Sequence, residues 1–146
     1  MKKGYEMSVR EQNLETIAPV LATFSIHQTA GVDDLKDADI GLAVTLTSDY
    51  EVGPGADAAV VLGKLVALSL SDADDGERKA TVQIGGICRL PTSATYPAVG
   101  NRVVGGANGT VKQAPALTGD DPAGGNLARG TVLAVNGTTD CTILLN

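Results

Sequence analysis

Two glycine-bearing stretches partly match the sequence motifs of nucleotide-binding loops. Residues 58–65 read AAVVLGKL, whereas a phosphate-binding loop, G-x-x-x-x-G-K-[ST], needs glycine at position 58 and a hydroxyl residue at position 65. Without them the backbone cannot wrap a phosphate and no side chain can ligate magnesium. Residues 53–58 fit a loose G-x-G-x-x-A pattern, but that motif must open a helix, and the Val-rich run that follows is a poor helix former. We therefore interpret these glycines as turn residues and expect no nucleotide cofactor.

The acidic segment at residues 72–76, DADDG, has the composition of a calcium-binding loop. Counting from Asp72, an EF-hand needs glycine at position six and a bidentate glutamate at position twelve, where this chain has Glu77 and Gln83. The EF-hand ligand set is therefore incomplete. A weak cation site on this loop, between Asp72 and Asp75, stays an open alternative.

The remaining side chains do not form a pattern that catalysis would require. The chain has one histidine, His27, and lacks both a G-x-S-x-G motif and a metal-spaced Cys/His pair. The carboxylate pairs at residues 33–34 and 120–121 lie in loop-like segments, which are usually solvated turns. We expect His27 to make an ordinary polar contact. The sequence predicts no catalytic site and no metal, so the chain is not expected to be an enzyme.

The length and composition of the chain limit the number of domains and the classes of partner. A chain of 146 residues is most simply a single domain, and it can hold a core without disulfides or metals. The net charge of −6, with three Tyr, one Phe and no Trp, disfavours nucleic-acid binding, which uses cations for phosphates and rings for bases. Cys88 and Cys141 lie in apolar strand patterns and are expected to be buried thiols, with a bridge between them left open.

The sequence has no pattern typical of a targeting or membrane-spanning segment. The first residues, Met-Lys-Lys, are followed by mixed and charged residues rather than by an apolar stretch. The apolar run at residues 17–26 contains Pro19 and is too short to span a bilayer. We expect a chain that stays in the cytoplasm of the cell that makes it, with no membrane partner.

The clearest structural signal is a pair of strands within residues 58–90, separated by an acidic loop at residues 71–78. In residues 81–90, TVQIGGICRL, the even positions are mostly apolar and the odd positions mostly polar, which predicts one buried and one wet face. The preceding strand alternates less clearly, because Lys64 interrupts a shared apolar face at Val60, Leu62, Val66, Leu68 and Leu70.

The rest of the sequence consists of short strand patterns between Gly- and Pro-rich turns, which predicts an all-β fold, either a compact β-sandwich or a β-barrel. Further strands are expected at residues 40–47, 102–105, 110–113, 130–136 and 141–146. Residues 48–58, 90–101 and 114–129 are predicted loops, and Asn108-Gly109 is a strong hairpin turn signal. Residues 1–39 lack clear alternation. They predict an extended N-terminal arm and connector that precede a compact β-domain at residues 40–146.

Four short motifs give this β-domain a resemblance to a known family. They are G-x-V/L-x-A-L at residues 63–68, T-V-Q-I-G-G at 81–86, P-A-V-G-N-R-V at 97–103 and A-R-G-T-V-L at 128–133. Together they resemble the small capsid decoration, or cement, proteins of tailed bacteriophages. The resemblance covers residues 58–146, and the first 57 residues contribute nothing to it.

The resemblance implies a structural virion protein, made in the host cytoplasm, that lies on the outer surface of the expanded phage head. It would clamp neighbouring subunits of the major capsid protein and would self-associate as homotrimers at three-fold or quasi-three-fold positions. The arm would bind the shell by burying its apolar side chains or by adding a strand to it. The expected capsid contacts are Tyr5, Leu14, Ile17, Val20, Leu21, Phe24 and Ile26.

Two other functions remain open on the sequence. One is a small ligand- or glycan-binding β-barrel module, in which the loop at residues 114–129 would cover the site, although sparse aromatic residues disfavour glycans. The other is a small enzyme, although catalytic groups usually appear as clustered titratable residues. Self-association in solution would favour a structural role over both, because it would bury strand edges.

Overall fold

The computed structural model describes residues 19–70, 77–119 and 127–146, and within these ranges the fold is all-β, as predicted. The strands are β1 (Val20–Ile26), β2 (Gln28–Thr29), β3 (Val32–Asp33), β4 (Ala43–Ser48), β5 (Glu51–Pro54), β6 (Gly63–Leu68), β7 (Lys79–Pro91), β8 (Val103–Gly105), β9 (Val111–Gln113), β10 (Thr131–Asn136) and β11 (Asp140–Leu145). Two short 3-10 turns, η2 (Asp37–Asp39) and η3 (Ala107–Gly109), join them. No helix among the described residues is long and apolar enough to cross a membrane.

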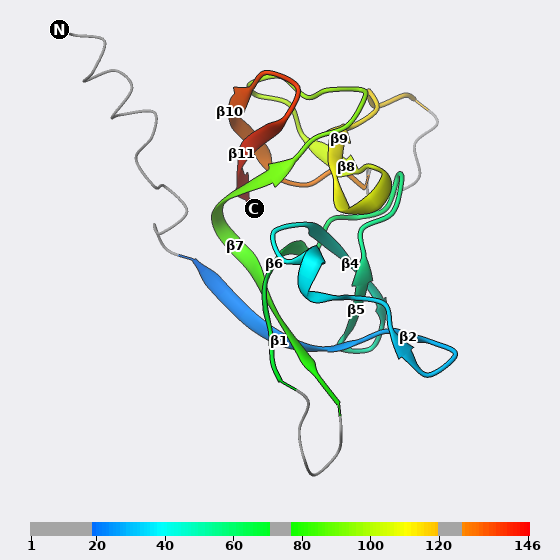
Figure 1. Ribbon diagram of the computed structural model, residues 1–146. Helices are drawn as coiled ribbons and strands as arrows, with labels where there is room; N and C mark the ends of the chain where they lie inside the picture. The colour runs from blue at the N-terminus through cyan, green and yellow to red at the C-terminus, as the bar shows by residue number, and fades with distance from the viewer. Residues whose placement is uncertain (1–18, 71–76, 120–126) are drawn as a thin grey trace, which may run out of the picture.

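Five of the strands form a closed barrel, which decides between the two predicted architectures. The sheet runs in the order β1-β5-β4-β6-β7, and β1 also pairs with β7, so the sheet closes on itself. The closure uses a parallel pairing of β1 with β5 and an antiparallel pairing of β1 with β7. Figure 1 shows this barrel in the lower half of the molecule, and we call it the barrel lobe.

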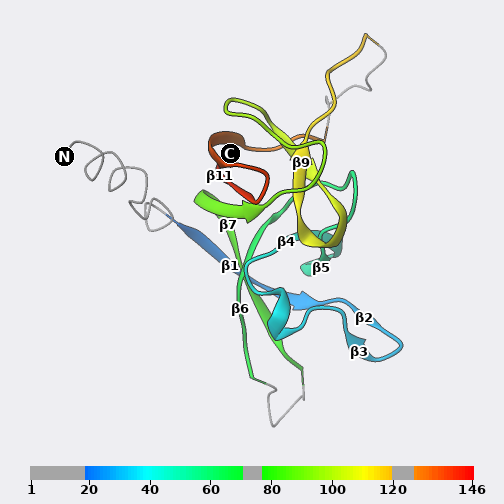
Figure 2. The ribbon, with the colours of Figure 1, turned by 45° about the horizontal axis from the view of Figure 1, so that its top comes forward.

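Strand β7 extends out of the barrel and organises a second group of strands. Its second half pairs with β11, which pairs with β10, while β8 and β9 form a separate hairpin beside them. We call β8–β11 with the end of β7 the hairpin lobe, which lies at the top of Figure 1 and again opposite the β2–β3 hairpin in Figure 2. Gly86, with φ of +85°, lies between the two halves of β7, where a left-handed conformation favours glycine.

Each lobe has its own apolar core. The barrel core contains Ile26, Leu35, Val44, Val52, Leu65, Ala80 and Val82. The core of the hairpin lobe contains Ala43, Val61, Cys88, Leu90, Val103, Val111, Val132, Cys141, Ile143 and Leu145. The division falls on either side of Gly86, because Ala80 and Val82 before it belong to the barrel core, whereas Cys88 and Leu90 after it belong to the core of the hairpin lobe.

Most predicted strands are confirmed, including both hairpins of the hairpin lobe. The turn at Asn108-Gly109 joins β8 to β9, with both residues at positive φ. In β7, the even positions are the buried face as predicted, but Gln83 on the opposite face is also buried. Its amide donates to the carbonyl oxygens of Gly85 at 3.1 Å and Ile87 at 3.0 Å, on either side of Gly86.

Two predictions about neighbouring strands are wrong. Residues 48–58, predicted as a loop, contain β5, which pairs with β4 to complete the barrel. The apolar face predicted for the strand before the acidic loop is only partly buried. Its members Leu62 and Leu68 pack against the barrel core and the other three are exposed, whereas Val61, Gly63 and Leu65 at the odd positions are buried. A bulge between Leu65 and Ala67 shifts the register of β6 against β7, so a single alternation does not describe the whole strand.

The described part of the predicted arm lies within the barrel lobe. β1 is a barrel strand, and Ile26 and Leu35 are buried in the barrel core. In this fold the compact domain therefore includes residues 20–39, although the boundary had been predicted at residue 40. Residues 1–18 lie outside the described residues.

Candidate functional site

A polar cleft of about 530 Å³ lies at the end of the barrel where β1 meets β2. Its walls come from three parts of the chain: the end of β1 with the β2–β3 hairpin, the β4–β5 turn, and the start of β7. The lining residues are Ser25, Ile26, His27, Gln28, Asp33, Thr47, Ser48, Glu51, Glu77 and Arg78. Hydroxyl, carboxylate and cationic side chains thus face one space, which suits a small polar ligand.

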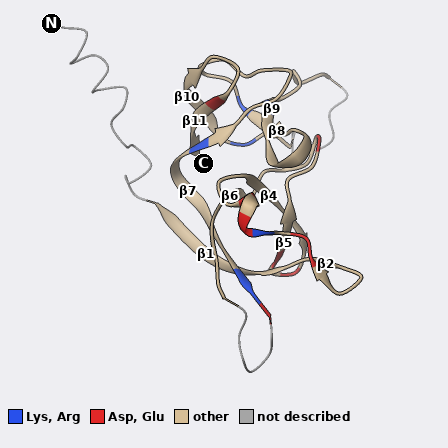
Figure 3. Cartoon of the chain, viewed as in Figure 1, with Lys and Arg blue, Asp and Glu red and all other residues tan. Residues whose placement is uncertain are grey.

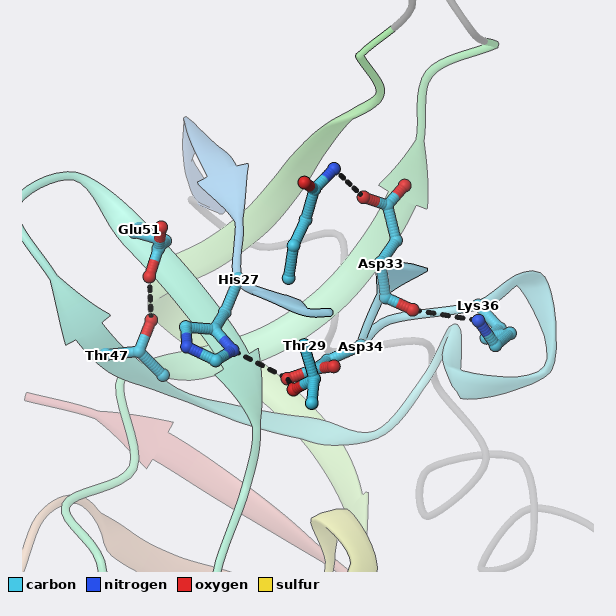
Figure 4. Close-up of polar contacts among 8 residues, drawn as sticks. His27, Thr29, Asp33, Asp34, Lys36, Thr47 and Glu51 are labelled. Atoms are coloured by element: carbon cyan, nitrogen blue, oxygen red, sulfur yellow. Dashed lines mark hydrogen bonds and ion pairs between the residues drawn. The ribbon is translucent and has the colours of Figure 1, made fainter. Parts of the chain in front are cut away.

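The β2–β3 hairpin positions the one histidine of the chain against a carboxylate. Gln28 pairs with Asp33 and Thr29 with Val32. In an antiparallel pair this register also places His27 opposite Asp34, one residue further from the turn. The turn between them uses Ala30 and Gly31, both at positive φ. Figure 4 shows the result: His27 Nδ1 lies 2.6 Å from Asp34 Oδ2, and the Thr29 hydroxyl donates to the same carboxylate at 3.1 Å.

This pairing shifts the pKa of both groups. The hydrogen bond to Asp34 raises the pKa of His27 above 6.5, with further support from the Asp34 and Glu51 charges. The hydrogen bonds from His27 and Thr29 lower the pKa of Asp34 below 3.8. Both side chains remain partly exposed, at 40% for His27 and 25% for Asp34, so a ligand or a proton can reach them.

The other polar residues of the cleft are fixed by contacts within the fold. The Thr47 hydroxyl donates to Glu51 at 2.7 Å, and the Gln28 amide donates to Asp33 at 2.8 Å (Figure 4). Arg78 donates to Asp37 at 2.7 Å and to the Ser69 carbonyl oxygen at 2.6 Å. The cleft is therefore preorganised.

The arrangement can bind polar groups and exchange a proton, but it does not assemble a nucleophile. His27 uses Nδ1 for Asp34, which leaves Nε2 to face a ligand. Among the described residues, no hydrogen bond joins this nitrogen to a hydroxyl group, as an activated serine or threonine would require. Within the same ranges, no three His, Cys, Asp or Glu side chains are grouped so that they could hold a metal ion.

Cys88 and Cys141 form no disulfide and are buried in the hairpin lobe, as expected. Burial raises the pKa of Cys141 to about 12, so its thiol stays protonated and unreactive at neutral pH.

A half-buried cation lies near Cys88, at the junction of the two lobes. The Arg129 guanidinium donates to the carbonyl oxygens of Val61, at 3.1 Å, and of Leu62 and Ile84. Desolvation lowers its pKa. The sequence did not single out Arg129, because its carbonyl partners leave no motif.

The residues predicted to contact a capsid fall into three groups. Val20 and Leu21 lie on β1 with 52% of each side chain exposed, and they are available for contact. Phe24 packs against the barrel core and Ile26 is buried in it, so these two support the fold. Tyr5, Leu14 and Ile17 lie outside the described residues.

The two segments that the sequence suggests for a cation or ligand site, residues 72–75 and 114–129, contribute no described residue to this cleft. The acidic loop around residues 72–75 lies outside the described residues. The described residues of the loop at 114–129 do not line the cleft, so the space available for a ligand lies at the opposite end of the molecule from the predicted one.

Sequence reasoning missed the cleft because its walls are far apart in the chain. A local signal for the His27–Asp34 pair does exist, namely a glycine-containing turn midway between a lone histidine and a carboxylate seven residues later. Comparison of the chain with protein-family models, with curated proteins and with solved structures finds no match.

Proposed function

We propose that this chain is a structural virion protein, a capsid decoration protein that binds the outer surface of an expanded phage head and clamps neighbouring major capsid subunits. The observation that carries the proposal is the position of β1. Its N-terminal half leaves the barrel with Val20 and Leu21 half exposed, directly after the segment that contains Tyr5, Leu14 and Ile17. This places an apolar strand at the base of the N-terminal segment.

The charge distribution and the family resemblance support the same role. β1 carries no charged residue, whereas the chain has a net charge of −6 (Figure 3). An uncharged apolar strand can lie against another protein without desolvating ions, while the acidic remainder favours solubility. The motifs at residues 63–68 and 81–86 lie on β6 and β7, within the rigid part of the barrel lobe.

Co-sedimentation with expanded heads of the source particle tests the proposal. We expect saturation at a fixed number of copies per shell, set by icosahedral symmetry. Leu21→Glu, in the full chain, should weaken binding at least tenfold, because a charge would have to be desolvated at the contact. Leu117→Glu is the matched control, since Leu117 is the same residue type and is also exposed but lies after β9.

Two outcomes would count against the proposal. Absence of wild-type binding to both expanded and unexpanded heads would exclude it. Equal loss of binding in both variants would show that the contact does not depend on β1. A truncation should end at residue 18, because removal of residues 20–26 would also remove a barrel strand.

The polar cleft favours a second candidate function, a small ligand-binding β-barrel module. The preorganised hydroxyl and carboxylate groups suit a neutral polyhydroxylated ligand, whose hydroxyl groups can donate to Glu51 and can either donate to or accept from His27 Nε2 according to the charge of the ring. Because the chain has one histidine, its ring resonances can be followed by NMR against a panel of sugars. Saturable shifts would support this function, and unchanged resonances would remove it.

A further inference from the structure

The N-terminal half of β1 has one edge without a strand partner among the described residues. β1 pairs with β7 from Val20 to Ser25, but it pairs with β5 only at Ser25 and Ile26. The amides of Ser25 and His27 donate toward β5, to the carbonyl oxygens of Tyr50 at 2.8 Å and Val52 at 2.9 Å. Since backbone groups alternate between the two edges of a strand, those of Leu21 and Thr23 point to this same edge, beyond the start of β5.

This edge lacks the features that usually protect a free strand. Val20–Ile26 reads VLATFSI, with no charged residue and no proline within it. Monomeric proteins commonly block such edges with lysine, proline or a bulge. The one bulge in this pairing, between Val20 and Leu21, adds its extra residue, Ile84, to β7, so β1 itself stays regular. Figures 1 and 2 both show this half of β1 outside the body of the barrel.

We propose that the edge of β1 pairs with the same edge of a second copy of this chain, antiparallel and about a two-fold axis at Ala22. In this register, Leu21 of each copy faces Thr23 of the other, and each of these residues both donates and accepts a backbone hydrogen bond across the axis. Ala22 then faces Ala22 of the second copy in a close pair that is not hydrogen-bonded. Its small side chain suits the short distance at the axis.

The ends of the open edge select this register among the alternatives. A shift in one direction would place Thr23 opposite Pro19, which has no amide to donate. A shift in the other direction would use the amide of Ser25, which already donates to Tyr50. The centred register also pairs Val20 with Phe24 of the second copy, an aromatic and β-branched pair that is favourable across strands.

A second copy is the preferred occupant because the edge is self-complementary and uncharged. Two copies of a chain with a net charge of −6 repel each other where their acidic groups meet, and β1 offers an approach without such groups (Figure 3). The pairing also sends the two chains preceding β1 in opposite directions. If the proposed function holds, a dimer would thereby reach two neighbouring shell subunits, but the pairing itself is independent of shell binding.

The proposal differs from the homotrimer that the family resemblance implies, and the two can be separated on the purified full-length protein. One strand pair forms a small interface, so we expect a weak dimer that appears as the concentration rises in sedimentation-velocity runs. Leu21→Lys adds like charges beside the axis and should raise the dimer dissociation constant at least tenfold. Leu117→Lys, an exposed position after β9, should leave it unchanged.

Cysteine trapping tests the register directly. Ala22→Cys should form an intermolecular disulfide under mild oxidation, because a close cross-strand pair brings the two Cβ atoms within bridging distance. Thr23→Cys is the control and should not cross-link with itself, since residue 23 faces residue 21. The native thiols of Cys88 and Cys141 are buried and should not interfere. A protein that stays monomeric at high concentration, a trimer that Leu21→Lys leaves intact, or preferential cross-linking through residue 23 would overturn the proposal.

Discussion

The barrel lobe and the hairpin lobe share one strand but are held together in different ways. The barrel closes through pairings between segments that are distant in the chain, β1 with β7 and β1 with β5. The hairpin lobe contains two hairpins of neighbouring strands, β8 with β9 and β10 with β11. Its longer-range pairings among the described residues are β11 with β7 and the single bridges of Thr92 with Val111 and of Val103 with Arg129. Local turns thus specify much of the hairpin lobe, whereas closure of the barrel by β1 depends on contacts between distant parts of the chain.

The two candidate functional surfaces lie in one of these lobes. The cleft and the open edge of β1 both belong to the barrel lobe, where closure is incomplete at the N-terminal half of β1. In the hairpin lobe, alternate residues of β11 fill the core: Cys141, Ile143 and Leu145 are all buried. The candidate functional surfaces therefore lie where pairing is long-range and partly open.

The largest effect is expected where β6 crosses β7, the strand common to both lobes. A Cβ atom at Gly63 would lie 1.9 Å from the carbonyl oxygen of Gln83, so the backbones would have to separate. Gly63→Ala should lower the free energy of unfolding by about 3 kcal/mol or more. Chemical denaturation measures this.

Gly119→Ala provides the control, because nothing lies within 4 Å of a Cβ there. We expect a change within about 0.5 kcal/mol. A Gly63→Ala protein of unchanged stability would show that β6 and β7 can separate without disturbing either lobe.

The difference between the lobes explains how much could be predicted from the sequence. Both hairpins of the hairpin lobe were predicted because Asn108-Gly109 and the turn after Asn136 are local signals. The sequence predicts β1 and β5 as parts of an arm and a loop, because neither strand alternates clearly. The partners of β1 also lie far away in the chain, whereas β5 pairs with the adjacent β4. The cleft was missed for a similar reason, because its walls come from distant parts of the chain. Ile26, His27 and Asp33 line it, but the sequence singles them out for unrelated reasons. No local pattern joins His27 to Glu51 or Arg78.

Equivalent cavities in the two cores test whether the lobes unfold together. Leu65 in the barrel core and Ile143 in the hairpin lobe are both fully buried. Leu65→Ala and Ile143→Ala should each cost about 3 kcal/mol. Because β7 belongs to both cores, we expect one cooperative transition in each variant. Separate transitions by calorimetry, or loss of hydrogen-exchange protection in one lobe alone, would show that the lobes are independent units.

Substitution of Arg129 should have a smaller effect on stability and reports on the junction between the lobes. Arg129→Met keeps much of the side-chain volume but leaves the carbonyl oxygens of Val61, Leu62 and Ile84 without this donor, for a loss of about 2 kcal/mol. Arg102→Met is the control, since Arg102 is exposed and donates to one carbonyl oxygen, that of Ala128. Equal losses in the two variants would mean that the junction contributes no more than a surface contact.

The smallest effect is expected at the cleft, and it should depend on pH. The pKa of His27 is raised, so its contribution to stability is present below about pH 6.5 and is lost as the pH rises through the raised value. The pKa of Asp34 is lowered, so its contribution is present above about pH 3.8 and is lost as the pH falls through the lowered value. The pair therefore stabilises the fold most between these limits.

The difference in melting temperature between the wild type and His27→Gln should accordingly be larger at about pH 5.5 than at about pH 8.5. NMR titration of the one histidine gives its pKa directly, and Asp34→Asn should return that pKa toward 6.5. A histidine pKa at or below 6.5 in the wild type would contradict the pairing on which the cleft is built.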